Sequence, residues 1–342
     1  MTNNLVIMSS KIAVIGAGSW GTTLAILLAE NSHDVLLWIF EEDELSKLEK
    51  ERVNTKYLPG ANFPQNLKLT GDLHQAVHFG DYLVISSPSH VVRTICQQFA
   101  NQVRDTHYIV NVAKGIENNT LKRMSEVIQE TLSISSDRIA TLYGPSHAEE
   151  VSKKIATAVV SASADIQTAR KVQTLFGNQY FRVYSSDDII GVELGGSLKN
   201  VIAIAAGICD GAGFGDNTKA ALLTRGMVEM TRLGVTMGAR QETFSGLSGI
   251  GDLIVTCMSK HSRNRYVGEQ IGRGRKLDDI LKEMVMVAEG VKTTRSVYQL
   301  MNKYNVEMPI SEQIYKVLFE DKPPIRAVGD LMSRDLKEEK ID

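Results

Sequence analysis

Along the first half of the chain, apolar runs alternate with amphipathic stretches in a pattern typical of strands separated by helices. The runs are short and rich in valine, isoleucine and leucine. They predict eight strands, at Lys11–Ile15, Asp34–Ile39, Leu67–Thr70, Asp81–Ser86, Tyr108–Val112, Ile139–Tyr143, Ala158–Ser161 and Tyr180–Tyr184. Strands that alternate with helices form a parallel sheet with helices on both faces. We therefore predict a doubly wound, mostly parallel sheet of the Rossmann type.

The strand signals stop near residues 186–193. The rest of the chain predicts helices at Leu194–Cys209, Lys219–Leu233, Leu277–Glu283, Thr293–Lys303, Glu312–Phe319 and Ile325–Leu331. A length of 342 residues is ordinary for two domains that each bury a core. We predict an α/β protein with a disordered leader over residues 1–10, a dinucleotide-binding domain over 11–190 and an all-helical substrate and catalytic domain over 191–342.

A glycine motif directly follows the first predicted strand. Gly16-Ala17-Gly18-Ser19-Trp20-Gly21 matches GxGxxG and runs into a stretch of helical character from Thr22 to Glu30. In this order the first glycine permits a tight turn, the second lets a pyrophosphate approach the backbone, and the third lets helix and strand pack closely. The N-terminus of the helix favours phosphate through its free N–H groups. The motif predicts a dinucleotide site, and a purely structural turn is the alternative.

The residues after the second predicted strand bear on the choice of nucleotide. Phe40 is followed by the acidic run 41–44, and no arginine is present. An acid at this place favours the free 2′-hydroxyl of NAD, whereas an arginine favours the 2′-phosphate of NADP. The run therefore favours NAD. Alternatively, these acids only occupy the first turn of the next helix, where the helix dipole stabilises them.

One lysine stands out in the second half. The stretch Gly191-Val192-Glu193-Leu194-Gly195-Gly196-Ser197-Leu198-Lys199-Asn200 reads as a glycine-rich turn that opens an apolar helix over Val201–Ile208. Lys199 is its only cation. Because an unpaired buried charge is strongly unfavourable, this ammonium group must reach water, an acid or a ligand. Lys199 is then either an ordinary surface lysine or a catalytic lysine at the floor of a cleft.

Further candidates follow two predicted strands. Lys114 comes after the strand at 108–112, and Gly144-Pro145-Ser146 comes after the strand at 139–143. The carboxyl ends of parallel strands form the ligand edge of such a sheet. Lys114 is alternatively a solvated loop residue, and Ser146 alternatively caps a helix.

Two loops of the second half are rich in polar residues. Asp252 closes the glycine-rich segment 247–252, and Ser262-Arg263-Asn264 lies in the segment 259–265. This row suits a phosphate group, because arginine binds phosphate with two parallel hydrogen bonds while serine and asparagine donate others. The alternative is the solvated start of a basic helix.

Composition narrows the function classes. The net charge of -2 argues against nucleic acid or a membrane surface as partner. Three scattered cysteines without a CxxC motif suggest a reducing, cytoplasmic compartment, and no metal-ligand spacing occurs. The segment 1–10 lacks the features of a signal peptide, and no apolar run has the length expected of a membrane span.

Several motifs occur together and in order. They are Gly16 to Gly21, Tyr57-Leu58-Pro59-Gly60, Lys114-Gly115, Gly144-Pro145-Ser146, Glu193 to Asn200, Gly249-Ile250-Gly251-Asp252, Ser262-Arg263-Asn264 and Val287-Ala288-Glu289-Gly290. In this combination the chain resembles the bacterial NAD(P)-dependent sn-glycerol-3-phosphate dehydrogenases. The resemblance runs from Lys11 to about Arg334, nearly the whole chain.

The resemblance implies roles for individual residues. Lys199 would be the proton donor and acceptor for hydride transfer between NAD(P)H and dihydroxyacetone phosphate, which yields sn-glycerol 3-phosphate for glycerophospholipid synthesis. The implied substrate site comprises Lys114, Gly144, Ser146, Lys199, Asp252, Ser262, Arg263 and Asn264. The implied cofactor contacts are Gly16, Gly18, Ser19, Trp20, Gly21, Phe40, Lys114, Ala148, Arg263, Val287 and Glu289. Many relatives carry a basic or polar residue in place of Phe40, and the family uses either nucleotide, so NAD and NADP both stay open.

Two other functions remain as alternatives. A β-hydroxyacid or ketoacid reductase shares the two-domain plan but needs a carboxylate site in place of the phosphate cluster. A non-catalytic protein that senses NAD(H) would not need Lys114, Lys199, Asp252 and Arg263 in one cleft. The sequence leaves a homodimer open.

Overall fold

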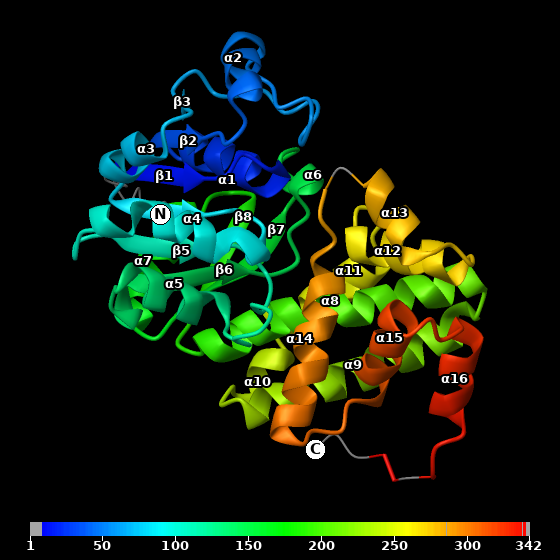
Figure 1. The fold of residues 1–342 in the computed structure, drawn as a ribbon. Coiled ribbons are helices and arrows are strands. Elements are labelled where there is room, and N and C mark those ends of the chain that lie inside the picture. The colour runs from blue at the N-terminus through cyan, green and yellow to red at the C-terminus, as the bar shows by residue number, and fades with distance from the viewer. Residues whose placement is uncertain (1–8, 285, 337, 340–342) are drawn as a thin grey trace.

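The computed structural model describes residues 9–284, 286–336, 338 and 339, and the chain folds into a sheet lobe followed by a helical lobe (Figure 1). Most of the predicted leader, residues 1–8, lies outside the described residues.

All eight predicted strands are present, within a few residues of the predicted bounds. They are β1 (Lys11–Ile15), β2 (Asp34–Trp38), β3 (Lys68–Thr70), β4 (Tyr82–Ile85), β5 (Tyr108–Asn111), β6 (Ile139–Tyr143), β7 (Thr157–Ser163) and β8 (Phe181–Ser186). They form one sheet in the order β3-β2-β1-β4-β5-β6-β7-β8. Neighbouring strands are parallel except β6 and β7, which are antiparallel. The prediction of a mostly parallel sheet is confirmed.

Helices cover both faces of the sheet, as the alternating pattern predicts. They are α1 (Ser19–Glu30), α2 (Glu42–Glu51), α3 (Leu73–Phe79), α4 (Val92–Phe99), α5 (Met124–Leu132), α6 (Ala148–Val151) and α7 (Ile166–Phe176). Leu24 of α1 and Val172 of α7 belong to the apolar core on one face. Val77, Cys96 and Val127, from α3, α4 and α5, belong to the core on the other face. The successive apolar strands are buried on both sides, which explains their continuous runs of aliphatic residues.

The second lobe is helical and is built around one long helix. Its elements are α8 (Ile189–Ala212), α9 (Gly215–Thr236), α10 (Gln241–Phe244), the π-helical turn η4 (Leu247–Gly251), α11 (Asp252–Met258), α12 (Arg263–Gly272), α13 (Leu277–Glu283), α14 (Glu289–Tyr304), α15 (Pro309–Phe319) and α16 (Pro324–Met332). α9, α11, α12 and α14 pack around α8 (Figure 1). All six predicted helices are found. α10 and α11 were not predicted, and α12 begins in the polar segment 259–265, for which a helix start was the alternative.

The interpretation of Gly191–Asn200 as a turn is wrong, and the overlapping prediction of a helix from Leu194 is confirmed, because the whole stretch is part of α8. Its glycines serve close packing instead. A Cβ on Gly195 would lie 2.7 Å from the carbonyl oxygen of Ser248, and a Cβ on Gly196 would lie 2.5 Å from the ring of Tyr143. These separations are too short for any side chain. The glycines therefore let η4 and β6 approach the helix, at a cost in helix propensity that the packing offsets.

A buried carboxylate joins the two lobes. Glu193 of α8 is 1% exposed. It accepts hydrogen bonds from Arg123 Nη1 at 2.7 Å, and from the backbone N–H and the hydroxyl of Ser125 at 2.9 and 2.5 Å. Burial raises the pKa of Glu193, although Arg123 and Ser125 oppose the shift. This satisfied ion pair fixes α8 against the start of α5, and so sets the position of Lys199 relative to the sheet.

The expectation about membrane spans needs one correction. α8 is long and apolar enough to cross a membrane by length and composition alone, but 89% of its most apolar window is buried inside the protein. The surrounding helices pack against the apolar surface of α8.

Candidate functional site

The structure brings Lys199, Asp252 and Lys114 into direct contact. Lys199 Nζ lies 2.6 Å from Asp252 Oδ1, and Lys114 Nζ lies 2.6 Å from Asp252 Oδ2. Lys199 also donates to the hydroxyl of Thr256 at 2.5 Å. One carboxylate therefore holds two ammonium groups. Lys114 lies in the loop after β5, and the other residues come from α8 and α11, so the cluster spans both lobes.

Burial differs across this cluster. The side chains of Asp252, Lys199 and Lys114 are 2%, 6% and 19% exposed. The surface alternative for Lys199 is therefore wrong. Lys114 also donates to the carbonyl oxygen of Gly144 at 3.1 Å. Because Lys114 has the largest exposed fraction of the three, it lies at the accessible side of the cluster, where it can meet a ligand. Lys199 and Asp252 lie deeper.

The electrostatics of the cluster favour proton transfer near neutral pH. Burial lowers the pKa of Lys199 to about 8, and the ammonium of Lys114 lowers it too, while Asp252 opposes the shift. Burial by itself would raise the pKa of Asp252, but Lys114 and Lys199 outweigh it and hold this pKa below its usual value. Asp252 therefore stays ionised, and Lys199 can exchange a proton at physiological pH.

The loop after β6 borders this cluster. Gly144 has a φ of +151°, and a Cβ there would lie 2.9 Å from Val159 Cα, so no other residue fits without strain. Ser146 Oγ donates to the Gly144 carbonyl at 3.0 Å. Pro145 packs next to Gly251, which precedes Asp252. The predicted substrate residues Gly144 and Ser146 thus lie beside Lys114 and Asp252.

The predicted phosphate residues lie at the start of α12. Ser262 caps this helix by accepting from the N–H of Arg265, so the alternative of a helix start is found here, and the phosphate role stays a prediction. Arg263 is exposed and donates from Nη1 to the carbonyl of Val287 at 2.8 Å. Asn264 donates to Asn200 Oδ1 at 2.9 Å and accepts from the N–H of Gly290 at 2.8 Å. Because Asn200 adjoins Lys199, this hydrogen bond connects the segment 262–264 to the lysine cluster.

The glycine loop has the shape that a dinucleotide requires. Gly16 has a φ of +115°, and a Cβ on Gly21 would lie 1.9 Å from the Gly16 carbonyl oxygen. A Cβ on Gly18 would meet nothing within 4 Å, so its surface is open. α1 begins after Gly18 with no side-chain cap and no acid in its first turn. Free N–H groups next to open space fit a pyrophosphate.

The other predicted cofactor residues are spread along this edge of the sheet. Ser19 and Trp20 begin α1, and Trp20 packs against Phe181 with ring centroids 6.3 Å apart. Ala148 begins α6, and its carbonyl accepts from Thr23 of α1 at 3.4 Å. Phe40 follows β2, three strand positions from β5 in the sheet, which corresponds to about 14 Å. A ligand that touches both Phe40 and Lys114 must therefore be extended.

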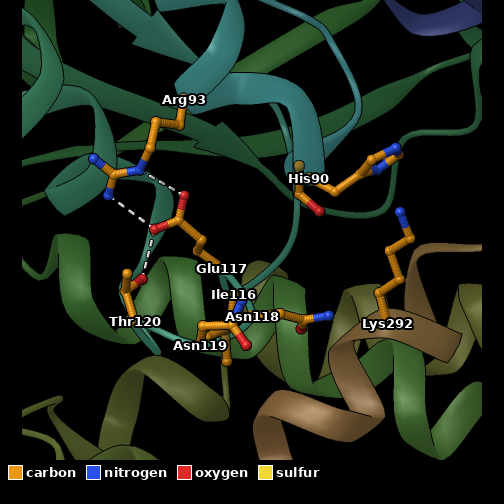
Figure 2. A pocket seen from close by; sticks show the side chains of 9 residues that line it. His90, Arg93, Ile116, Glu117, Asn118, Asn119, Thr120 and Lys292 are labelled. Carbon is orange, nitrogen blue, oxygen red and sulfur yellow. Dashed lines mark hydrogen bonds and ion pairs between the residues drawn. The ribbon is translucent and has the colours of Figure 1, made fainter.

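Glu289 connects the start of α14 to the sheet lobe. Its carboxylate accepts from the N–H of Ser89 at 3.0 Å and from the Ser89 hydroxyl at 2.5 Å. Next to this contact lies a cavity of about 380 Å³ (Figure 2). In Figure 2 the side chain of Lys292 points toward the ring of His90, and Arg93 is bonded to Glu117. None of the lysine cluster lines this cavity, so it is not the centre of the chemistry.

Three residues of the site have no individual role in the sequence analysis. Thr256 accepts from Lys199, Asn200 bonds Asn264, and Ser89 bonds Glu289. A helix over α11 would have indicated Thr256, since it lies four residues after Asp252 on the same face. Asn200 adjoins Lys199, but its orientation toward α12 follows from packing. Among the described residues, no group of His, Cys, Asp and Glu could hold a metal ion.

The sequence matches two halves of one family along nearly its whole length. Residues 11–169 match the family described as NAD-dependent glycerol-3-phosphate dehydrogenase N-terminus, and residues 188–329 match the C-terminus. The glycerol-3-phosphate dehydrogenase [NAD(P)+] of Prosthecochloris aestuarii is 54% identical over 96% of this chain and 99% of its own length. The enzyme of the same name from Lysinibacillus sphaericus is 51% identical over 97% of this chain and 98% of its own.

Solved structures agree with this match. The glycerol-3-phosphate dehydrogenase of Coxiella burnetii is 38% identical with a TM-score of 0.91, covering 95% of this chain and 99% of that one. A D-mandelate dehydrogenase in complex with NADH has a TM-score of 0.60 at 12% identity, covering 91% of this chain and 98% of that one. This second likeness shows the fold alone.

Proposed function

The chain belongs to the NAD-dependent glycerol-3-phosphate dehydrogenase family, and we propose that it interconverts dihydroxyacetone phosphate and sn-glycerol 3-phosphate with NAD(P)H, using Lys199 as the proton donor and acceptor. The observation that carries this proposal is the buried Asp252 carboxylate between two lysines at the junction of the lobes. Relatives of over 50% identity and near-complete coverage support an oxidoreductase that acts on a CH–OH group.

Lys199 supplies the proton chemistry. Bound NAD(P)H provides the hydride for the C2 carbonyl carbon of the substrate. As negative charge develops on the carbonyl oxygen, the Lys199 ammonium stabilises it and donates a proton to it. The products are the secondary alcohol and a neutral lysine. In the reverse direction, neutral Lys199 accepts the hydroxyl proton. Because the pKa of Lys199 is about 8, neither protonation state is costly near neutral pH.

Asp252 positions the ammonium group of Lys199, and Lys114 lies beside it. Asp252 stays ionised and holds Lys199 through a 2.6 Å contact, which fixes the direction of Nζ. Lys114, at the more accessible position, contacts substrate and cofactor. We place the division between the dinucleotide-binding and catalytic domains at residues 190 and 191, so that the reaction occurs where the two lobes meet.

The glycine loop and a second group of residues near the helical lobe would hold the two halves of the cofactor. The open backbone at Gly18 and the uncapped α1 receive the pyrophosphate. Ala148, Val287 and Glu289 lie toward the helical lobe and would contact the nicotinamide half. We propose that NAD is preferred over NADP. Phe40 is 73% exposed and offers its ring for stacking, and the adjacent Glu41 carboxylate, which accepts from Tyr57 at 2.8 Å, would repel a 2′-phosphate despite its pairing with Lys56.

The activity test compares cofactors and substrates directly. Oxidation of NADH by dihydroxyacetone phosphate is expected, with a higher kcat/KM than oxidation of NADPH. Simple ketoacids serve as the competing substrates. If they are reduced and dihydroxyacetone phosphate is not, the chain is a ketoacid reductase. If no substrate oxidises NADH, a sensing role replaces the enzyme.

Arg263→Ala should weaken substrate binding more than cofactor binding. Loss of a charged hydrogen bond to the phosphate is expected to raise the KM for dihydroxyacetone phosphate by about tenfold or more. The dissociation constant for NADH, measured by fluorescence, should change far less. Arg273→Ala is the matched control, because Arg273 is an exposed arginine at the other end of α12 that pairs with Glu269. Equal effects on substrate and cofactor would count against a phosphate role for Arg263.

We also propose that the enzyme works in the cytoplasm and that its product feeds glycerophospholipid synthesis. Cys96, Cys209 and Cys257 are all free and buried. Unpaired thiols at these positions are typical of a reducing compartment.

A further inference from the structure

His147 carries a buried ring nitrogen that has no protein partner. The residue lies between Ser146 and Ala148 and forms the N-cap position of α6. Its Nε2 atom is buried and makes no hydrogen bond with the described residues. Buried polar atoms in folded proteins nearly always have a partner. A group that binds from outside the chain would therefore complete the hydrogen bonding of His147.

The backbone of this loop places His147 beside the lysine cluster. Two residues before Ser146, the carbonyl of Gly144 accepts from Lys114, and Pro145 packs next to Gly251. Burial lowers the pKa of His147, and the ammonium groups of Lys199 and Lys114 lower it further, while Glu149 and Asp252 act in the opposite direction. The ring is thus neutral near pH 7 and can offer one N–H group without adding positive charge.

The ring of His147 also lies near a ring of the helical lobe. The ring centroids of His147 and His261 are 5.8 Å apart. His261 directly precedes Ser262 and Arg263, the residues assigned above to the substrate phosphate. His147 therefore lies close enough to Lys199 and Lys114 for their charges to act on it, and it contacts the residue that precedes the proposed phosphate residues.

We infer that His147 contacts the substrate and donates a hydrogen bond from Nε2 to a phosphate oxygen of the triose phosphate. Lys199 already serves the carbonyl end, so the unpartnered nitrogen is assigned to the other end of the ligand. A phosphate has several acceptor oxygens, and a neutral donor adds to Arg263 without a third cation next to the lysines. This inference rests on the proposed function and makes His147 a residue that selects phosphorylated over unphosphorylated substrate.

The test compares His147→Phe with His147→Gln. The phenylalanine variant should raise the KM for dihydroxyacetone phosphate by about tenfold, with little change in kcat or in the KM for NADH. Inorganic phosphate, used as a competitive inhibitor, should lose affinity by a similar factor. Turnover of unphosphorylated dihydroxyacetone should stay at the wild-type level. Glutamine keeps an N–H donor and should recover most of the loss. His78→Phe, at an exposed histidine of α3, controls for the substitution itself.

The outcomes separate this inference from the proposed function. Wild-type protein that fails to reduce dihydroxyacetone phosphate refutes the function. Active wild type with an unchanged KM in His147→Phe overturns the inference alone. An equal loss with dihydroxyacetone also overturns it, because the contact then lies away from the phosphate. If His147→Phe and His147→Gln both lose NADH affinity or thermal stability to the same extent, His147 has a structural role. That result overturns the inference too.

Discussion

Lys199→Ala should lower kcat for the reduction of dihydroxyacetone phosphate by about a thousandfold, because general acid catalysis and stabilisation of the developing charge are lost together. The substitution also removes the ammonium group of a side chain that is 6% exposed and leaves Lys114 as the remaining cation paired with Asp252. Binding of NADH, measured by fluorescence, should stay within a few-fold of the wild-type value, since the glycine loop lies in the other lobe.

The matched control is Lys219→Ala. Like Lys199, Lys219 pairs with an aspartate. Its partner is Asp210 of α8, at 2.8 Å. It lies away from the lysine cluster, so kcat should be nearly unchanged. Near-normal turnover in Lys199→Ala would reject the assignment of this residue as proton donor. Loss of NADH binding in the same variant would indicate a collapse of the site.

Asp252→Asn should lower kcat/KM by about a hundredfold at pH 7. Asparagine preserves the shape of the side chain but cannot neutralise two ammonium groups. The carboxylate opposes the lowering of the Lys199 pKa, whereas burial and Lys114 cause it. Without the carboxylate this pKa falls below about 8, and less of the enzyme carries the proton needed for reduction. The pH profile of kcat for reduction should shift to lower pH.

Asp210→Asn provides the comparison for this variant. Asp210 also joins two cations, Lys219 and Arg265, through contacts of 2.8 and 2.7 Å. It lies on α8 about 16 Å from Lys199 along the helix axis. A similar loss of activity in both variants would show that Asp252 acts only through stability. A pH profile that stays in place in Asp252→Asn would contradict its effect on Lys199.

The sheet and the glycine loop were predictable because their signals are local. Each strand is a short aliphatic run buried on both sides. The GxGxxG motif indicates a dinucleotide site because it joins a strand, β1, to a helix, α1. The same holds for Lys114 and Gly144, which follow strands at the ligand edge. Residue type and position along the chain are enough to place these groups near one another.

The middle of the helical lobe was not predictable from local patterns. Gly195 and Gly196 look like turn residues, yet they lie inside α8. Glycine is needed there because Ser248 and Tyr143 leave no room for a side chain. α12 was predicted only as an alternative, for a related reason. A Cβ on Gly268 would lie 2.0 Å from the carbonyl oxygen of Ile204, so this glycine permits close packing of two helices. Tertiary contacts override helix propensity here. The partner of Lys199 could not be identified without them.

The direct test of the account is the pH dependence of kcat for the wild-type enzyme in both directions. The pKa of Lys199 is lowered to about 8 by burial, and reduction needs the protonated form. Reduction should therefore be fast below this pKa and decline as pH rises through it. Oxidation of sn-glycerol 3-phosphate needs the neutral form and should rise over the same range. Opposite profiles that cross near pH 8 are the predicted result. Profiles that stay flat through this range in both directions would contradict the role of Lys199.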